Sequence, residues 1–377
     1  MESIEQMIKR LCPKGVEWKK ISEIAYYPKV RINTEILSVD TYVGVESLIK
    51  DRGGKTSSSS LPEGVAIEFL PQDILIGNIR PYLKKIWLSD CQGGTNGDVI
   101  CIRVLDSKEV IPKYLYHNLA SDKFFDYDNS HAKGGKMPRG DKNAILAYKI
   151  PVPPLEIQSR IVEVLDKMAT LTAELKAELE ARKQQYEYYR SKLLTFNEIG
   201  GGNRQVAWKK ISEICVKVYS GRNKSKTEQG LYPVYGSTGI IGMCESPVYN
   251  KRQILVARVG ANAGFVHLAD GSYDVSDNTI IIDLSKEVNQ KFVFYMLRNA
   301  NLNKFAKGGG QPLLTATQIK DFVIPVPSME EQQRIVSILD RFETLTTDLQ
   351  SGLPAEIEAR RQQYEYYRNK LLTFEAV

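Results

Sequence analysis

Two long stretches of the chain place apolar residues at alternating steps of four and three positions. A sustained 3.5-residue period is typical of a coiled-coil seam. In the first stretch only Thr172 and Arg182 break the apolar rule. The seam positions are Ile161, Leu165, Met168, Thr172, Leu175, Leu179, Arg182, Tyr186, Tyr189, Leu193 and Phe196. The pattern predicts a long coiled-coil helix, the first arm, over residues 154–198.

The second stretch keeps the same register and predicts a C-terminal coiled-coil helix, the second arm, over residues 328–377. Four extra residues interrupt its register, and SGLP at Ser351–Pro354 contains two helix breakers, so we expect a break or a restart there. Whether the helix stays continuous through this point is left open. The seam positions are Ile335, Leu339, Phe342, Thr346, Leu349, Ile357, Arg360, Tyr364, Tyr367, Leu371 and Phe374.

Outside the arms, short apolar runs bounded by Gly, Asp, Asn and Pro predict β-strands. They are AIEFLP, DILIGNI and DVICIRV in the first half, and QILVARV and TIIIDL in the second. IPKYLYHNLASDKFF and VNQKFVFYMLRNANLNKFA predict helices. The fold class is therefore α/β (α+β), with one mixed domain at residues 1–153 and a similar one at residues 199–327.

The two halves of the chain are copies of one plan. KQQYEYYRSKLLTF at Lys183–Phe196 returns as RQQYEYYRNKLLTF at Arg361–Phe374. VEWKKISEI returns as VAWKKISEI at the start of each domain, and PVPPLEIQSRIVEVLD returns as PVPSMEEQQRIVSILD at the start of each arm. An internal repeat with such unlike sequence between the copies predicts a duplicated two-part protein and not a solenoid.

We expect the two arms to pair with each other in antiparallel fashion and to hold the domains at opposite ends. A parallel pair would need a long return linker, and only GGGNRQ at Gly200–Gln205 is available. The alternative is that the arms are ordinary core helices of two bundles. Thirty-odd residues in heptad register favour the coiled coil.

Composition excludes some classes of protein. Among the 377 residues no run of about 18 apolar residues is present, and MESIEQMIKRLCPKG lacks the apolar stretch of a signal peptide, so we expect a cytoplasmic protein. The five cysteines form no CxxC pair and read as reduced thiols. The net charge of +6 is compatible with a polyanionic partner without proving one.

Motifs for catalysis are also missing. GKT in DRGGKTSSSS lacks the earlier glycine of a phosphate-binding loop, because position 49 is Ile. GSTGIIG and GANAG lack the strand, turn and helix setting of a dinucleotide site and read as turns. Three scattered histidines have no metal-ligand spacing. We therefore expect no catalytic residue and no metal site in this chain.

This organisation resembles the specificity (S) subunit of type I DNA restriction–modification systems over essentially the whole chain. The sharpest elements are PVPPLEIQSRIVEVLD, PVPSMEEQQRIVSILD, the twin QQYEYYR…KLLTF ends, both WKKISEI openings and YPVYGSTGIIG. The resemblance implies two target-recognition domains, each reading half of a bipartite DNA site, with a pseudo-two-fold repeat. It implies double-stranded DNA, two modification (adenine methyltransferase) subunits and restriction subunits as partners. It implies no cofactor in this chain, with S-adenosylmethionine, ATP and Mg expected on partner subunits.

Candidate DNA-binding residues lie in loops rich in Arg, Lys, Asn, Ser and Gly, because cations contact phosphates and Arg, Lys, Asn or Gln read base edges. We select Arg80, Lys84, Lys85, Lys136 and Arg139 in the first domain, and Arg222, Lys224, Arg258, Lys307 and Gln311 in the second. For each of them, a solvated surface charge is the competing interpretation.

Candidate partner-binding residues follow from the seam. With Tyr186 and Tyr189 on it, we expect Tyr188, Leu194, Tyr366 and Leu372 to point outward and to dock the modification subunits. From Ile161 to Phe196 the seam covers 36 residues, or roughly 54 Å of helix, so the arms can set an unread spacer between half-sites.

Two other functions remain open at this stage. One is the specificity chain of a restriction class whose methylation and cleavage reside in a single partner. The other is a scaffold whose coiled coil is the function and whose domains bind protein. The sequence does not give the DNA target or the spacer length.

Overall fold

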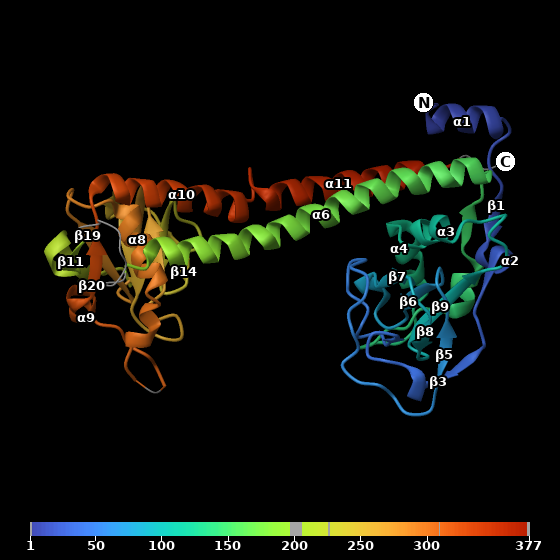
Figure 1. The fold of residues 1–377 in the computed structure, drawn as a ribbon, viewed down its shortest axis with the longest axis horizontal. Coiled ribbons are helices and arrows are strands. Elements are labelled where there is room, and N and C mark those ends of the chain that lie inside the picture. Colours follow the sequence, from blue (N-terminus) through green and yellow to red (C-terminus); the bar gives the residue numbers. More distant parts are fainter. Residues whose placement is uncertain (1, 197–205, 225–226, 309, 375–377) are drawn as a thin grey trace. The chain divides into compact units, whose positions relative to one another are not determined.

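The computed structural model describes residues 2–196, 206–224, 227–308 and 310–374 (Figure 1). It divides into two compact units. Unit 1 contains Met1–Leu175 and Ile357–Val377, and unit 2 contains Lys176–Glu356. Each unit therefore combines one domain with parts of both arms. The predicted domain boundaries stay predictions, and the linker expected at Gly200–Gln205 lies outside the described residues.

The core of unit 1 is an antiparallel sheet of four strands. In spatial order they are β2 (Ala25–Tyr26), β9 (Val99–Val104), β6 (Ile74–Gly77) and β7 (Ile86–Leu88). Ile74, Leu75 and Ile76 of β6 are each 0% exposed, so both faces of this strand are covered. A strand that is buried on both faces has a continuous run of apolar residues. The segment DILIGNI, from which this strand was predicted, contains such a run in Ile74, Leu75 and Ile76.

A second sheet of unit 1 has one parallel pair, β4 with β8. In spatial order its strands are β3 (Arg31–Asn33), β5 (Val65–Phe69), β8 (Gly93–Thr95) and β4 (Tyr42–Val43). The 3₁₀ helix η1 (Thr34–Ile36) follows β3 in this sheet, whereas η2 (Pro81–Leu83) lies between β6 and β7 of the first sheet. A ribbon of β1 (Trp18–Lys20) and β10 (Lys149–Pro151) joins the WKKISEI segment to the residues before the first arm.

The helices of this domain contribute side chains to the same buried cluster as the first sheet. They are α1 (Ile4–Leu11), α2 (Ile21–Ile24), α3 (Pro112–Leu119), α4 (Asp122–His131) and α5 (Lys142–Ala147). The single helix predicted from IPKYLYHNLASDKFF is two helices, because Oγ of Ser121 accepts a hydrogen bond from N of Phe124 at 3.2 Å and caps a new helix. Phe124 packs with the apolar side chains of β6 in one buried cluster.

Unit 2 repeats the first sheet and the ribbon. The sheet is β12 (Cys215–Ser220), β19 (Thr279–Leu284), β16 (Gln253–Ala257) and β17 (Val266–Ala269), and it is antiparallel again. The ribbon is β11 (Ala207–Lys210) with β20 (Val323–Val326). The repeat found in the sequence is thus a repeat of topology.

The second sheets of the two units share three strands and differ in the fourth. In unit 2 the order is β14 (Gly239–Cys244), β13 (Tyr232–Gly236), β18 (Ser272–Val275) and β15 (Tyr249–Asn250), and β13 pairs with β18 in parallel. The parallel pair matches β4 and β8 of unit 1. Unit 2 adds β14 beside β13, whereas unit 1 adds β3 on the opposite edge. The copies have therefore diverged most in this sheet.

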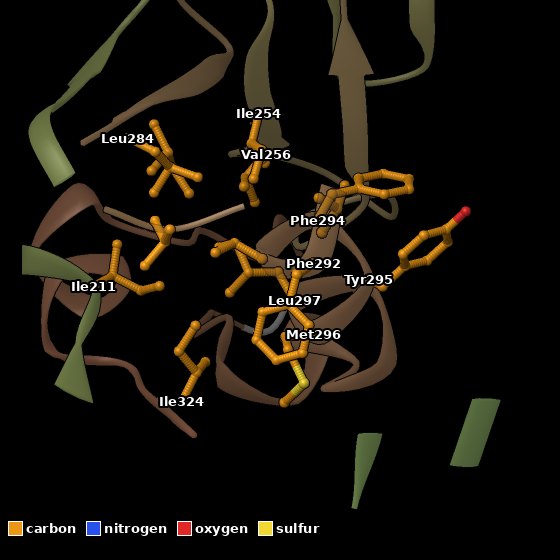
Figure 2. Packing of buried hydrophobic residues seen from close by; sticks show 14 of the residues in the cluster. Ile211, Ile254, Val256, Leu284, Phe292, Phe294, Tyr295, Met296, Leu297 and Ile324 are labelled. Carbon is orange, nitrogen blue, oxygen red and sulfur yellow. The ribbon is translucent and has the colours of Figure 1, made fainter. Parts of the chain in front are cut away.

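The core of unit 2 forms between its first sheet and its helices, α7 (Ile211–Ile214), α8 (Gln290–Asn299), the 3₁₀ helix η3 (Leu302–Phe305) and α9 (Ala316–Asp321). Figure 2 shows Phe292 and Leu297 of α8 packed toward Val256 of β16. Tyr295 turns its hydroxyl away from this cluster (Figure 2). Burial of such apolar side chains is the main stabilising contribution to the domain.

The first arm is one helix, α6 (Leu155–Leu194), whose first part belongs to unit 1 and whose last part belongs to unit 2. The second arm is two helices, α10 (Met329–Thr347) and α11 (Leu353–Leu371). The expected break near Ser351–Pro354 is confirmed. Pro354 lies in the first turn of α11, where its missing N–H costs no helix hydrogen bond.

Within each unit the two arms run antiparallel, as predicted (Figure 1). In unit 1, Leu372 shares a buried cluster with Ile161 near the start of α6. In unit 2, Phe342 of α10 stacks on Tyr189 near the end of α6 with ring centroids 5.7 Å apart. One predicted seam position is wrong, because Leu349 follows the end of α10 and is 80% exposed.

Candidate nucleic-acid interface

In unit 1 two loops are joined by backbone hydrogen bonds at one end of the sheet. N of Lys133 donates to O of Arg139 and N of Arg139 donates to O of Lys133, both at 2.8 Å, which closes a hairpin. N of Arg80, in the loop after β6, donates to O of Pro138 at 2.7 Å. We call residues 78–85 and 133–139 loop pair 1. It contains the five predicted residues of unit 1: Arg80, Lys84, Lys85, Lys136 and Arg139.

The cations of loop pair 1 differ in how they are held. The side chain of Arg139 is 59% exposed and forms an ion pair with Asp98 at 2.9 Å. Lys136 is exposed, and Nε of Arg80 is buried without a hydrogen-bond partner among the described residues. The guanidinium groups of Arg80 and Arg139 therefore keep N–H donors that can bind phosphate oxygens or the edges of guanine bases.

Lys84 and Lys85 are engaged within unit 1. Nζ of Lys84 contacts Oδ1 of Asp122 at 2.5 Å, and Nζ of Lys85 donates to O of Val45 at 2.6 Å. Burial lowers the pKa of Lys85, and the charge of Glu46 only partly opposes this. These partners lie far away in sequence and were not visible in the loop composition. DNA contact by the two lysines stays a prediction.

Unit 2 builds the same arrangement from different residues. N of Lys307 donates to O of Leu313 at 3.0 Å, and N of Leu313 donates back at 2.8 Å. N of Gly260, in the loop after β16, donates to O of Pro312 at 3.0 Å, just as Arg80 bonds Pro138. We call residues 258–265 and 307–313 loop pair 2; position 309 lies outside the described residues. Loop pair 2 brings together Arg258, Lys307 and Gln311.

Arg222 and Lys224 lie next to a turn that also anchors loop pair 2. N of Arg222 donates to O of Val275 at 3.1 Å, and N of Arg258 donates to O of Asn278 at 2.9 Å. Arg222, Lys224, Lys307 and Gln311 are exposed, and Arg258 is half-buried. The end of β18 and the turn after it therefore hold the backbone of Arg222 and of Arg258, which joins the loop of Arg222 to loop pair 2.

Sequence reasoning missed a buried acid beneath loop pair 1. Asp128 is 1% exposed, and neither of its carboxylate oxygens has a hydrogen-bond partner among the described residues. Burial raises its pKa to about 6, helped by the charge of Asp141 and opposed by His131. Oδ1 of Asn78, the first residue of the loop, also lacks a partner. Nothing in the local sequence DYDNSH distinguishes Asp128 from its exposed neighbour Asp126.

Of the four residues that we expected to point outward as a partner surface, the two tyrosines are exposed and the two leucines are buried. Tyr188 is 59% exposed and Tyr366 is 61% exposed, and each meets the next tyrosine edge-on. Leu194 and Leu372, which we expected to point outward, are 3% and 8% exposed. That expectation is wrong because the last turn of each arm rests on a domain as well as on the other arm, so it buries a wider face than a two-helix seam does.

Other classes of site are not built by the described residues. Across residues 2–196, 206–224, 227–308 and 310–374, no three His, Cys, Asp or Glu side chains come together as a metal site. No helix in those ranges is long and apolar enough to cross a membrane. The five cysteines are free thiols.

Comparisons with known proteins agree with the duplicated fold. The family model for the type I restriction modification DNA specificity domain matches residues 75–181 and again residues 203–359. The EcoR124I/EcoR124II specificity subunit of Escherichia coli is 36% identical over 304 residues, covering 71% of this chain and 72% of that protein. A putative type I specificity subunit of Mycoplasma pneumoniae is 32% identical over 319 residues, covering 78% and 91%.

Solved structures share the fold at low sequence identity. The type I restriction–modification S subunit of M. genitalium superimposes with a TM-score of 0.61 at 16% identity, covering 95% of this chain and 96% of that one. The HsdS subunit of Thermoanaerobacter tengcongensis gives a TM-score of 0.54 at 18% identity, covering 96% and 97%.

Fold, repeat and sequence together define a two-domain DNA-recognition protein. The chain belongs to the family of type I restriction–modification specificity subunits. It is the non-catalytic DNA-recognition component of such a system.

Proposed function

We propose that each unit reads one half of a bipartite site on double-stranded DNA through its loop pair. The observation that carries this is the repeated bond between loop and hairpin, Arg80 to Pro138 and Gly260 to Pro312. The scaffold is the same twice, while the side chains on it differ: Arg139 stands where the second hairpin has Leu313. Equal scaffolds with unlike side chains suit two half-sites of different sequence, because base contacts specify and backbone contacts position.

The partners follow from the twin tyrosines. Tyr188 and Tyr366 occupy matching places in the two copies of QQYEYYR, and both are more than half exposed. Large exposed aromatic side chains are enriched at protein interfaces. We assign these two surfaces to two modification subunits, which would carry S-adenosylmethionine and methylate adenine. Restriction subunits would add ATP- and Mg-dependent cleavage.

The arms supply the spacer in this proposal. Because α6 is one unbroken helix with residues in both units, its length limits which half-site separations the chain can span. The bases between the half-sites would then go unread.

The test is duplex DNA binding by the chain together with its modification subunits, using Arg258→Ala with Lys307→Ala in unit 2. We expect the double variant to lose selectivity for one half-site while the other half-site is still required. Lys286→Ala is the matched control, because this exposed lysine follows the opposite end of β19 from loop pair 2. Equal behaviour of the double variant and the control would refute the assignment.

A further inference from the structure

A buried glutamine in the first turns of each arm makes two matching hydrogen bonds in both units, and Nε2 of Gln158 also donates to O of Glu109 at 2.9 Å. Gln158 of α6 is 0% exposed and Gln332 of α10 is 1% exposed. Oε1 of Gln158 accepts from N of Ile111 and Oε1 of Gln332 accepts from N of Asn289, both at 2.9 Å. Each Nε2 donates at 2.8 Å to the carbonyl of the proline that precedes its arm, Pro153 or Pro327.

The partners of these glutamines show what they connect. Ile111 is the N-cap residue of α3, and Asn289 is the N-cap residue of α8. These two helices carry buried side chains of the domain cores. Each glutamine therefore ties its arm to the core helix of its own domain. A buried amide that loses such partners leaves unsatisfied polar groups behind, so the position is held tightly.

An ion pair fixes a second point along each arm. Nζ of Lys113 contacts Oδ2 of Asp166 at 2.7 Å, and Nζ of Lys291 contacts Oδ2 of Asp340 at 2.6 Å. The acid follows the glutamine by eight residues in both arms, which is about 12 Å along a helix. One fixed point would allow the arm to pivot on its domain, whereas two fixed points define its direction.

We propose that Gln158 and Gln332 are positioning residues for spacer selection. Each glutamine, with the ion pair beyond it, holds its arm at one angle to the domain that reads DNA. A change of that angle would displace one loop pair relative to the other half-site, so a rigid joint restricts the chain to one spacer length. This inference rests on the proposed reading of two half-sites.

The experiment uses the complex of the full chain with its modification subunits. Its probes are duplexes built from the methylated site found in cells, with the native spacer or with a spacer one base pair shorter or longer. The variants are Gln158→Leu, Gln332→Leu and the double variant, because leucine fills a similar volume without the hydrogen bonds. The readout is the ratio of methylation rates on native and altered spacers.

We expect this ratio to fall by about fivefold in each single variant. A factor of five equals about 1 kcal/mol, which is the typical net contribution of one hydrogen bond to stability. It should fall further in the double variant, while the half-site sequences stay the same. Gln253→Leu is the matched control, because Gln253 is also 1% exposed but lies on β16 and accepts its bond from Tyr273 OH of β18, so it joins no arm to a domain. We expect Gln253→Leu to keep the native ratio.

Two results separate failure of the inference from failure of the proposed function. Equal slowing on all three spacers in the glutamine variants would overturn the positioning role and leave half-site reading intact. If the unaltered chain shows no dependence on spacer length, the proposed function itself fails. Should the leucine variants not fold, Lys291→Met removes only the half-exposed ion pair. An unchanged ratio in that variant would overturn the role of the joint.

Discussion

Arg368 of α11 donates from Nη2 to Oδ2 of Asp122 at the start of α4, at 3.0 Å, although 246 positions separate the two residues. The guanidinium is fully buried and lies over the ring of Tyr364 at 5.5 Å. Asp122 also accepts from Arg52 and Lys84 at 2.5 Å each. One carboxylate thus links the second arm, the loop that carries Arg52, and Lys84 of loop pair 1.

Removal of this carboxylate is expected to weaken unit 1. Burial raises the pKa of Asp122, but the bonds from Lys84 and Arg52 and the charge of Arg368 outweigh it and bring the pKa to about 2. In Asp122→Ala the buried Arg368 loses its partner, which typically costs about 3 kcal/mol. Amide hydrogen exchange of β6 and β9 measures this, with β16 and β19 as the internal reference.

The control for this prediction is Asp126→Ala, an exposed acid on the same helix. It should change the exchange of β6 and β9 by less than about 0.5 kcal/mol. Equal effects of the two substitutions would show that Asp122 is an ordinary surface charge.

The buried acid Asp128 predicts a pH dependence of unit 1. Its pKa is about 6 in the folded chain against an ordinary value of 3.8, so the folded state keeps a proton that the unfolded state releases. Stability is therefore lost as the pH rises from about 4 to about 6, on the order of 2–3 kcal/mol in total. Asp128→Asn should remove this loss and stabilise unit 1 at pH 8, seen as slower exchange of β6. A variant less stable than the unaltered chain at pH 8 would contradict the assignment.

The exposed tyrosines predict a defect of assembly without a defect of folding. In Tyr188→Ala with Tyr366→Ala the chain should keep its fold, because both side chains are mostly in solvent. Its complex with modification subunits should weaken by more than about tenfold if these tyrosines are central to the interface. Gel filtration and sedimentation measure the complex. Leu171→Ala, which removes a 38% exposed apolar side chain of the same helix, is expected to leave assembly unchanged.

The length of the first arm predicts the spacer. Four residues added after Leu175 lengthen a helix by about 6 Å, and DNA rises about 3.4 Å per base pair. The second arm already has four extra residues, so the seam should tolerate the insertion as a stutter. We expect the spacer to grow by one or two base pairs with both half-sites unchanged. Altered half-sites with an unchanged spacer would refute this.

The sequence predicted the structure best where the spacing of apolar residues has a single physical cause, the burial of one helix face against a second helix. The seam through Ile161, Leu165 and Leu175 is buried as predicted, and the breakers near Pro354 end the long helix. Periodicity failed at Leu194 and Leu372, because it assigns one face to a two-helix seam and cannot show that a domain covers another face. The partners of Lys84 and Lys85 were out of reach for a related reason: Asp122 and Val45 lie 38 and 40 positions away.

The internal repeat locates the residues of the two loop pairs better than the amino-acid composition of the loops does. AKGG occurs in both domains, at 132–135 and 306–309 of the sequence, and its lysine, Lys133 or Lys307, closes the hairpin that bonds the loop after a central strand. An alignment of these two segments pairs Pro138 with Pro312 from the amino-acid letters alone. It does not reveal Asp128, whose place in α4 is matched in unit 2 only by the shorter η3.

The most direct test of DNA recognition by two loop pairs is a genome-wide map of methylated adenines in cells that contain the modification subunits. The map is compared for the unaltered chain and for a chain with Arg258→Ala, Lys307→Ala and Gln311→Ala. The account predicts a bipartite motif for the unaltered chain. In the variant one half-site should be relaxed or lost while the other half and the spacer stay the same. A motif that is not bipartite, or one that changes in both halves, would contradict it.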